Sequence, residues 1–184
     1  MRKIIVSNFV SLDGYIAGPD GELDWHLVDK DFLDYAEDML NSVDTILFGR
    51  KTYEMMADYW PKPEPRVNDP VIAGKMNGLP KIVFSKTLDK VEWENSSLVK
   101  ENIKETVLKL KQQPGKDIVI LGSGTIVSAF TQMGIIDEYR IIINPVILGA
   151  GKTQFNEGPD KKILKLTEVR RFSSGVIVLY YQPI

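Results

Sequence analysis

Apolar residues recur along the chain in short runs with two different spacings. Seven runs are dense in Val, Ile, Leu, Tyr and Phe and are bounded by Gly, Pro, Asp or Ser, which is typical of β-strands: residues 2–10, 43–49, 81–85, 117–122, 138–148, 163–172 and 175–182. Four other runs have apolar residues at helical spacing, which predicts helices over residues 30–41, 50–60, 101–113 and 124–134. The pattern therefore predicts a sheet of seven or more strands connected mainly by helices.

The order of these runs predicts how the strands pair. Strands and helices alternate over the first three quarters of the chain, which favours parallel strands with helices on both faces of the sheet. The last two strands have no helix between them and meet at Ser173-Ser174-Gly175, so we expect an antiparallel hairpin there. The Pro-rich segment Trp60–Pro70 is expected to be an ordered surface loop. We therefore predict an α/β fold with a mixed, mostly parallel central sheet, in a single domain over residues 1–184.

Composition and charge narrow the function classes. The 184 residues include 23 basic and 25 acidic side chains, for a formal charge of -2, so the chain has no overall basic field to hold nucleic acid or an anionic membrane. It has no Cys and a single His, His26, which excludes disulfides and leaves too few ligands for a structural or deaminase-type zinc site. His26 has no identified partner and is expected to be a surface or packing residue. The apolar run at the start is too short for a membrane span or a signal segment, so we expect a cytoplasmic protein.

Gly122-Ser123-Gly124 lies where a predicted strand enters a predicted helix. Glycines there allow a tight packing turn, and the same geometry leaves free N–H groups at the positive end of the helix, which suit a pyrophosphate. The motif alone leaves both interpretations open. A standard dinucleotide fingerprint is excluded, because it needs a third Gly where this chain has Val127 and an acidic residue after the next strand.

A second strand-to-helix junction carries cations where helices normally carry acids. Arg50 and Lys51 follow Gly49, although a helix N-terminus is already positive. A bound anion would explain them, since Arg offers bidentate geometry to a phosphate, and a pair of solvated charges is the alternative. A third strand ends at Ser85-Lys86-Thr87. Because ligands of open α/β sheets bind beyond the carboxyl ends of strands, these junctions together predict a site for a phosphate-rich dinucleotide.

Taken in order, four motifs resemble the dihydrofolate reductase-like fold: Ser11-Leu12-Asp13-Gly14, Gly49-Arg50-Lys51-Thr52-Tyr53-Glu54, Phe84-Ser85-Lys86-Thr87 and Gly122-Ser123-Gly124. More closely, the chain is similar, over nearly its whole length, to the reductase domain of the bacterial riboflavin-pathway bifunctional deaminase-reductase and its single-domain relatives. The resemblance implies an NADPH-dependent reductase, like 5-amino-6-(5-phosphoribosylamino)uracil reductase, that transfers hydride to a small heterocyclic or carbonyl substrate. It implies cofactor contacts from Gly49, Arg50, Lys51, Thr52, Ser85, Lys86, Gly122, Ser123, Gly124, Thr125, Ile126 and Val127. Two cations at one helix start also favour NADPH over NADH.

The substrate end is defined less sharply. The segment Ser11–Trp25 is rich in Gly and Asp and predicts a loop that covers the nicotinamide. The resemblance implies that Ser11, Asp13 and Trp25 lie near the substrate. From the residues alone, Asp13 equally suits a turn before Gly14, and Trp25 suits the core better than a stacking platform. A substrate phosphate would need cations of its own, for which no motif exists; the candidates are Arg66, Lys75 and Lys152.

Two further functions stay open. A dihydrofolate or pterin reductase uses a buried carboxylate on its first helix, where this chain has Asp31 and Asp34 outside the apolar stripe and therefore expected in solvent. A non-catalytic NADPH-binding module would need only the cofactor features.

The segment Glu138–Phe155 is unusually apolar: the resemblance implies that it helps form a homodimer, and a central strand buried on both faces is the alternative.

Overall fold

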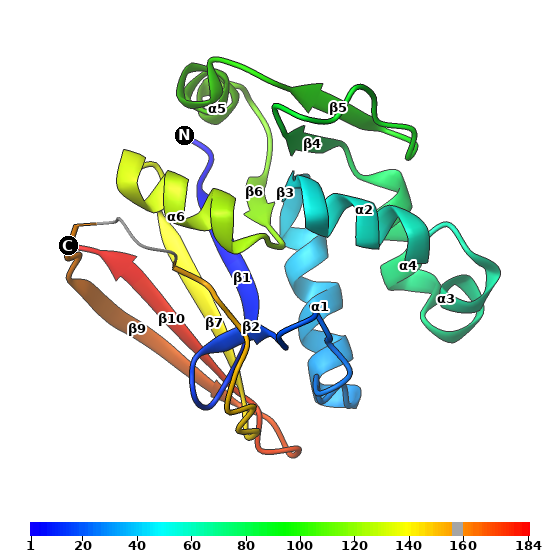
Figure 1. The fold of residues 1–184 in the computed structure, drawn as a ribbon, viewed down its shortest axis with the longest axis vertical. Helices are drawn as coiled ribbons and strands as arrows, with labels where there is room; N and C mark the ends of the chain where they lie inside the picture. Colours follow the sequence, from blue (N-terminus) through cyan, green and yellow to red (C-terminus); the bar gives the residue numbers. More distant parts are fainter. Residues whose placement is uncertain (156–159) are drawn as a thin grey trace.

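Eight strands form one mixed sheet in the computed structural model, which describes residues 1–155 and 160–184 (Figure 1). In spatial order they are β5 (Ser96–Val99), β4 (Lys81–Phe84), β3 (Val43–Gly49), β6 (Asp117–Ile120), β1 (Ile4–Ser11), β7 (Glu138–Asn144), β10 (Ile177–Pro183) and β9 (Leu164–Arg171). The first six are parallel, and β10 runs antiparallel to both β7 and β9. A separate two-stranded ribbon pairs β2 (Tyr15–Ala17) with β8 (Lys152–Thr153). The predicted α/β fold, with its mostly parallel sheet and C-terminal hairpin, is confirmed.

Helices cover both faces of the sheet. They are α1 (Lys30–Ser42), α2 (Arg50–Tyr59), α3 (Pro63–Asn68), α4 (Pro70–Gly78), α5 (Ile103–Gln112) and α6 (Gly124–Met133). On one face, α5 and α6 pack on a cluster that includes Val6 and Ile120. On the other, α1, α2 and α4 pack on a cluster that includes Ile46 and Phe48. No helix in the described ranges is long and apolar enough to cross a lipid bilayer.

The Pro-rich segment Trp60–Pro70 was expected to be a loop, and this expectation is wrong. It contains the short helix α3, with Pro63 and Pro65 in its first turn, and Pro70 then begins α4. Proline is compatible with the first turn of a helix because the N–H groups there have no intrahelical partner. Prolines that suggested an irregular segment therefore start two helices.

The apolar segment Glu138–Phe155 begins with an inner strand. β7 lies between β1 and β10, with Phe9 paired to Ile142 on one side and Val178 paired to Ile142 on the other. It ends at Asn144, directly before Pro145, which has no N–H for a sheet hydrogen bond. A central position therefore accounts for the apolar run. The homodimer stays a prediction.

The two acidic residues of α1 have different surroundings. Asp34 is exposed, as expected, and forms an ion pair with Lys30, with Nζ and Oδ2 2.7 Å apart. Asp31, which was also expected in solvent, is half-buried, and its Oδ2 accepts hydrogen bonds from the backbone N–H of Ser173, at 2.9 Å, and from the Ser173 hydroxyl, at 2.7 Å. These bonds lower the pKa of Asp31 and join α1 to the β9–β10 hairpin. Asp31 therefore lacks the raised pKa that a proton donor to a pterin needs, and Asp34 is exposed in its ion pair.

Candidate functional site

Two helices begin side by side at the carboxyl edge of the sheet. β3 and β6 are adjacent, with Leu47 paired to Ile120; β3 leads directly into α2 and β6 into α6. The N–H of Gly49 donates to the carbonyl oxygen of Gly122 at 3.4 Å, which joins the two junctions. Neither N-cap residue, Gly49 for α2 or Ser123 for α6, caps its helix through a side chain. The first N–H groups of two helices are therefore free to bind an anion in one place.

Packing explains why this junction contains glycines. Gly122 has φ +100°, which strongly favours glycine, and a Cβ there would lie 2.9 Å from Thr52 Oγ1. A Cβ on Gly124 would lie 2.8 Å from the carbonyl oxygen of Thr153 in β8. The β2–β8 ribbon thus rests on the first turn of α6. The packing-turn interpretation is sufficient for the glycines, so the case for an anion site rests on the uncapped N–H groups and the nearby cations.

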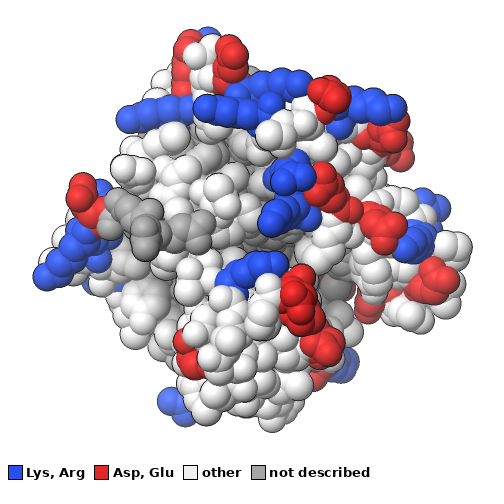
Figure 2. Space-filling view, in the orientation of Figure 1, with Lys and Arg blue, Asp and Glu red and all other residues white. Residues whose placement is uncertain are grey.

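Cations surround the start of α2. Arg50 and Lys51 are both exposed; the Arg50 guanidinium lies 3.5 Å from the Glu54 carboxylate, and Lys51 forms no ion pair with any described residue. Lys86 follows β4 and is also exposed. Figure 2 shows Lys and Arg side chains gathered near the middle of this face, where α2 begins in Figure 1. The cations predicted for a phosphate therefore come from adjacent strand ends.

Lys100 is a further cation that the sequence interpretation missed. It follows β5, whose Val99 pairs with Phe84 of β4, so it lies at the strand end next to the β4 junction. Its Nζ is 3.9 Å from a carboxylate oxygen of the fully exposed Asp89. The sequence feature that could have revealed Lys100 is a strand, Ser96–Val99, followed directly by a cation. The same pattern indicated Arg50.

Some of the predicted cofactor residues have fewer groups to offer. Ser85 Oγ already accepts N–H groups from Thr87 and Leu88, at 3.2 and 3.1 Å. Ile126 and Val127 point into the core, and the N–H of Val127 donates to Ser123 O at 3.1 Å. Val127 therefore has no group left for a ligand. Thr125 is exposed on the first turn of α6.

Ser11 and Asp13 hold loops together. Ser11 Oγ donates to Asp13 Oδ1 at 2.7 Å and accepts the N–H of Tyr15 at 2.9 Å. The Asp13 carboxylate also accepts the N–H groups of Leu148, at 3.1 Å, and Gly149, at 2.7 Å. These hydrogen bonds lower the pKa of Asp13. Its carboxylate is thus used to join the loop after β1 to the loop after β7, which matches the turn interpretation of this motif.

An aromatic group lies at the end of β1 on the α1 face. The rings of His26 and Phe9 stack with centroids 4.0 Å apart, and Trp25 meets His26 edge-on at 4.4 Å. Trp25 is buried and donates its Nε1–H to Glu22 O at 3.0 Å, so it is a packing residue. Burial lowers the pKa of His26 to about 4, against a weaker opposing effect of Asp24. His26 is a packing residue, as expected, and it is neutral at pH 7.

The three candidate cations for a substrate phosphate do not come together. Arg66 is exposed on α3 and Lys75 is half-buried on α4, both on the side of the sheet near β4. Lys152 belongs to the β2–β8 ribbon, with its Nζ 3.2 Å from the position of a Cβ on Gly21 (Figure 1). No shared phosphate site is formed by these three residues.

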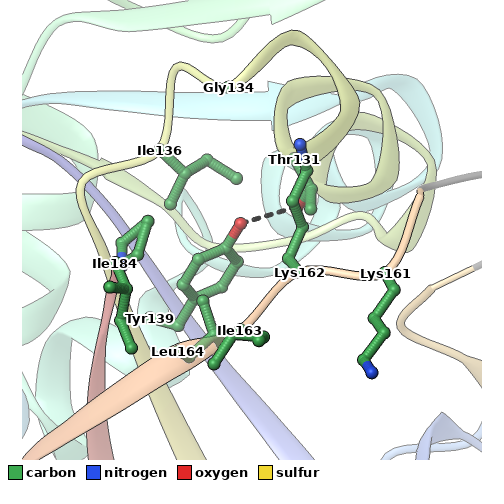
Figure 3. A pocket seen from close by; sticks show the side chains of 10 residues that line it. Thr131, Gly134, Ile136, Tyr139, Lys161, Lys162, Ile163, Leu164 and Ile184 are labelled. Carbon is green, nitrogen blue, oxygen red and sulfur yellow. Dashed lines mark hydrogen bonds between the residues drawn. The ribbon is translucent and has the colours of Figure 1, made fainter.

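A cavity of about 450 Å³ lies at the other end of the parallel strands, near the start of β7 (Figure 3). Its lining includes Gly134, at the C-terminal end of α6, and Tyr139, near the start of β7. The hydroxyls of Tyr139 and Thr131 hydrogen bond to each other at 2.9 Å. Because α6 separates this cavity from the two helix N-termini, it is not part of the candidate site.

Comparison with known proteins assigns the family. A family model described as the RibD C-terminal domain matches residues 2–178. The chain belongs to this family. It is 38% identical to YyaP, an uncharacterised protein of Bacillus subtilis (strain 168), over 98% of this chain and 94% of YyaP.

Solved structures agree on the fold of this RibD C-terminal domain. A diaminohydroxyphosphoribosylaminopyrimidine deaminase/5-amino-6-(5-phosphoribosylamino)uracil reductase from Thermotoga maritima matches with a TM-score of 0.70 and 16% identity, over 100% of this chain and 57% of that one. A dihydrofolate reductase from Enterococcus faecalis, complexed with NADP(H), matches with a TM-score of 0.62 and 17% identity, over 98% and 96% of the two chains. The fold is dihydrofolate reductase-like, and at these identities the likeness concerns the fold alone.

Proposed function

We propose that this protein is an NADPH-dependent reductase of the riboflavin-pathway type, resembling 5-amino-6-(5-phosphoribosylamino)uracil reductase, with a small heterocyclic or carbonyl substrate. The observation that carries the proposal is the pair of uncapped helix N-termini at Gly49 and Ser123, with Arg50 and Lys51 beside them. Family membership and the NADP(H) complex of the Enterococcus enzyme support it. NADPH would supply the hydride, and the protein would bind and orient the reactants.

The positions of the cations indicate how the cofactor would be oriented across the strand ends. Arg50, Lys51, Lys86 and Lys100 follow β3, β4 and β5, so the 2′-phosphate and adenosine belong on that side. The N–H groups of Gly124 to Ile126 at the start of α6 would hold the pyrophosphate. Strand order then directs the nicotinamide toward β1, under the β2–β8 ribbon. The substrate would lie there as well, near the aromatic group of Phe9 and His26.

A folate-type reductase is the less favoured alternative. Asp31 uses its carboxylate to bind Ser173, and Asp34 is exposed in an ion pair with Lys30. Without a buried acid on α1, a pterin would have no residue there to manage its proton. A binding module that turns nothing over would share the cofactor site and lack hydride transfer. Stopped-flow measurement of NADPH absorbance with pyrimidine and carbonyl substrates separates the binding module from the proposed reductase, because only the reductase oxidises NADPH.

Replacing Arg50 by Ala should remove a preference for NADPH over NADH. We expect wild type to bind NADPH more tightly than NADH. The substitution should weaken the binding of NADPH by roughly 1–3 kcal/mol and leave the binding of NADH nearly unchanged, because only NADPH carries the 2′-phosphate. Calorimetric titration at fixed low salt measures both. Arg66→Ala, an exposed Arg on α3, is the matched control and should change neither affinity. If wild type binds neither nucleotide, the proposed function is wrong.

We also propose that the homodimer forms through the β9–β10 part of the sheet. Leu166 and Val169 on β9 are exposed, and they face the same side as their β10 partners Tyr181 and Leu179. α6 crosses the sheet over β1 and β7 and leaves β9 and β10 uncovered on this side (Figure 1). A second copy offers the same apolar strip, so the two could cover each other across a two-fold axis.

Charges placed in this strip should separate the dimer. Sedimentation velocity is expected to give the mass of two chains for wild type and of one chain for the Leu166→Glu/Val169→Glu double variant, since a second copy would bury both carboxylates. Lys165→Glu is the matched control: it lies on the same strand but pairs with Gln182 on the opposite face, and should stay dimeric. A wild type that sediments as a single chain at all concentrations contradicts the proposal.

A further inference from the structure

Two buried carboxamide side chains lack hydrogen-bond partners near the start of α6. Asn8 is 7% exposed, and its Nδ2 atom has no partner among the described residues. Gln154 is 4% exposed, and neither its Nε2 nor its Oε1 has one in the same part of the chain. Leaving a buried polar atom unpaired costs stability, so such atoms usually have a partner, and a ligand is one way to provide it.

Asn8 lies where β6 leaves the sheet. β1 pairs with β6 only as far as Val6 and Ile120, after which the chain of β6 turns through Gly122 into α6. Side chains alternate along a strand, so Asn8 faces the same side as Ile4 and Val6, which pack in the cluster with α6. Asn8 therefore lies between the sheet and α6, two residues beyond the last pair of β1 with β6.

Gln154 approaches the same helix from the opposite side. It follows β8, and its carbonyl oxygen accepts the Ser128 hydroxyl at 3.2 Å. The same oxygen lies 3.0 Å from the position of a Cβ on Gly124. Gln154 is thus seated on the first turn of α6, where the β2–β8 ribbon covers it. The backbone of Gln154 therefore borders this helix start from the ribbon, and Asn8 lies on the face of the sheet that α6 covers.

The proposed function places the pyrophosphate at this helix start and the nicotinamide end of the cofactor next to it, on the β1 side. The cations that favour the 2′-phosphate follow β3, β4 and β5, and the pyrophosphate would lie at the start of α6, beyond β6. Continuing in the same direction along the strand order reaches β1, which carries Asn8. The remaining group of the dinucleotide therefore extends toward the two unpaired carboxamides.

We propose that Asn8 and Gln154 bind the carboxamide of the nicotinamide ring and so fix the orientation of the ring. The inference rests on the proposed function. Gln154 offers both a donor and an acceptor, and the ligand group that complements it must accept and donate in turn. A carboxamide does both, whereas a phosphate or a carboxylate only accepts. Asn8 Nδ2 supplies one more donor, for the second lone pair of the carboxamide oxygen.

Gln154→Met tests the proposal with two independent readouts. Met has nearly the same length and no polar atoms to satisfy, so urea unfolding of the free protein should show equal or greater stability. NADPH and NADH should both bind at least tenfold more weakly in calorimetric titration, since both carry the carboxamide. Adenosine 2′,5′-bisphosphate, which has no nicotinamide, should bind within twofold of wild type. Gln132→Met, an exposed position on α6, is the matched control and should change none of these values.

The outcomes separate this inference from the proposed function. If wild type binds neither NADPH nor adenosine 2′,5′-bisphosphate, the proposed function fails and the inference fails with it. If wild type binds both and Gln154→Met binds NADPH as tightly as wild type, only the inference is overturned. A loss of stability in the free Gln154→Met protein also overturns it, because the amide would then already have a partner such as ordered water. Asn8→Leu repeats the test from β1, with the same expected results.

Discussion

Replacing Lys81 by Met is expected to lower the free energy of unfolding by roughly 3–5 kcal/mol, because each carbonyl oxygen left without a hydrogen bond in the interior costs about 1–3 kcal/mol. Lys81 is 1% exposed, and its ammonium donates to three carbonyl oxygens at the end of α4: Met76 at 2.9 Å, Asn77 at 3.0 Å and Leu79 at 2.8 Å. Burial lowers its pKa to about 8, so the ammonium is still protonated at pH 7 and can serve all three. Methionine would remove this donor from all three oxygens, of which only that of Asn77 keeps another, the Asn95 amide at 3.1 Å, among the described residues.

Urea unfolding at pH 7 measures the effect. Lys104→Met, on the exposed side of α5, removes the same charge and is expected to change stability by less than about 0.5 kcal/mol. A Lys81→Met protein as stable as this control would show that the three carbonyl contacts contribute little.

Lys81 is also connected to the helix that carries Arg50. Its Nζ lies 4.4 Å from the centre of the Trp93 ring, and Tyr53 of α2 accepts the N–H of Trp93 at 3.0 Å. Lys81 thus helps to hold the helix that begins with Arg50.

The arrangement of the sheet could be predicted because it depends on local pattern. The run Val43–Gly49 is apolar apart from Asp44 and Thr45 near its start, which is typical of a parallel strand covered on both faces. The hairpin at Ser173-Ser174-Gly175 followed from two strands without an intervening helix. β5 was missed because Ser96–Val99 is short and carries two serines. α4 was missed because Gly74, Gly78 and the neighbouring prolines hide a helix that the sheet stabilises by packing.

The candidate site was predictable where single residues break a local rule, and not where partners are distant in sequence. Arg50 and Lys51 were visible because cations are unfavourable at a helix N-terminus. The task of Asp13 was not, since it binds the N–H of Gly149 in a loop that the sequence places far away. Gln154 carried no signal at all: a glutamine after a Gly-rich stretch is unremarkable until the fold buries it beside Gly124. Long-range burial, rather than motif, decides these residues.

Acid should destabilise the protein through His26 by roughly 3 kcal/mol between pH 6.5 and pH 4, the free energy that corresponds to this change in pKa. Burial against Phe9 and Trp25 lowers the pKa of His26 in the folded protein to about 4. In the unfolded chain, where the imidazole is in water, the pKa is 6.5. Between these values the unfolded chain binds more protons than the folded one, so stability falls as the pH falls. The contribution is complete above pH 6.5 and lost progressively down to pH 4.

His26→Phe isolates this effect, because it keeps an aromatic ring against Phe9 and cannot titrate. The carboxylates are the same in both proteins, so their contributions cancel in the difference between the two unfolding free energies. That difference should shift by roughly 3 kcal/mol in favour of the variant from pH 6.5 to pH 4. Because His26 is the only histidine of the chain, its ring protons give one titration curve by NMR that checks the pKa directly. A difference that stays constant with pH would mean that the folded protein lets the imidazole reach water, and that the aromatic group at the end of β1 is open rather than packed.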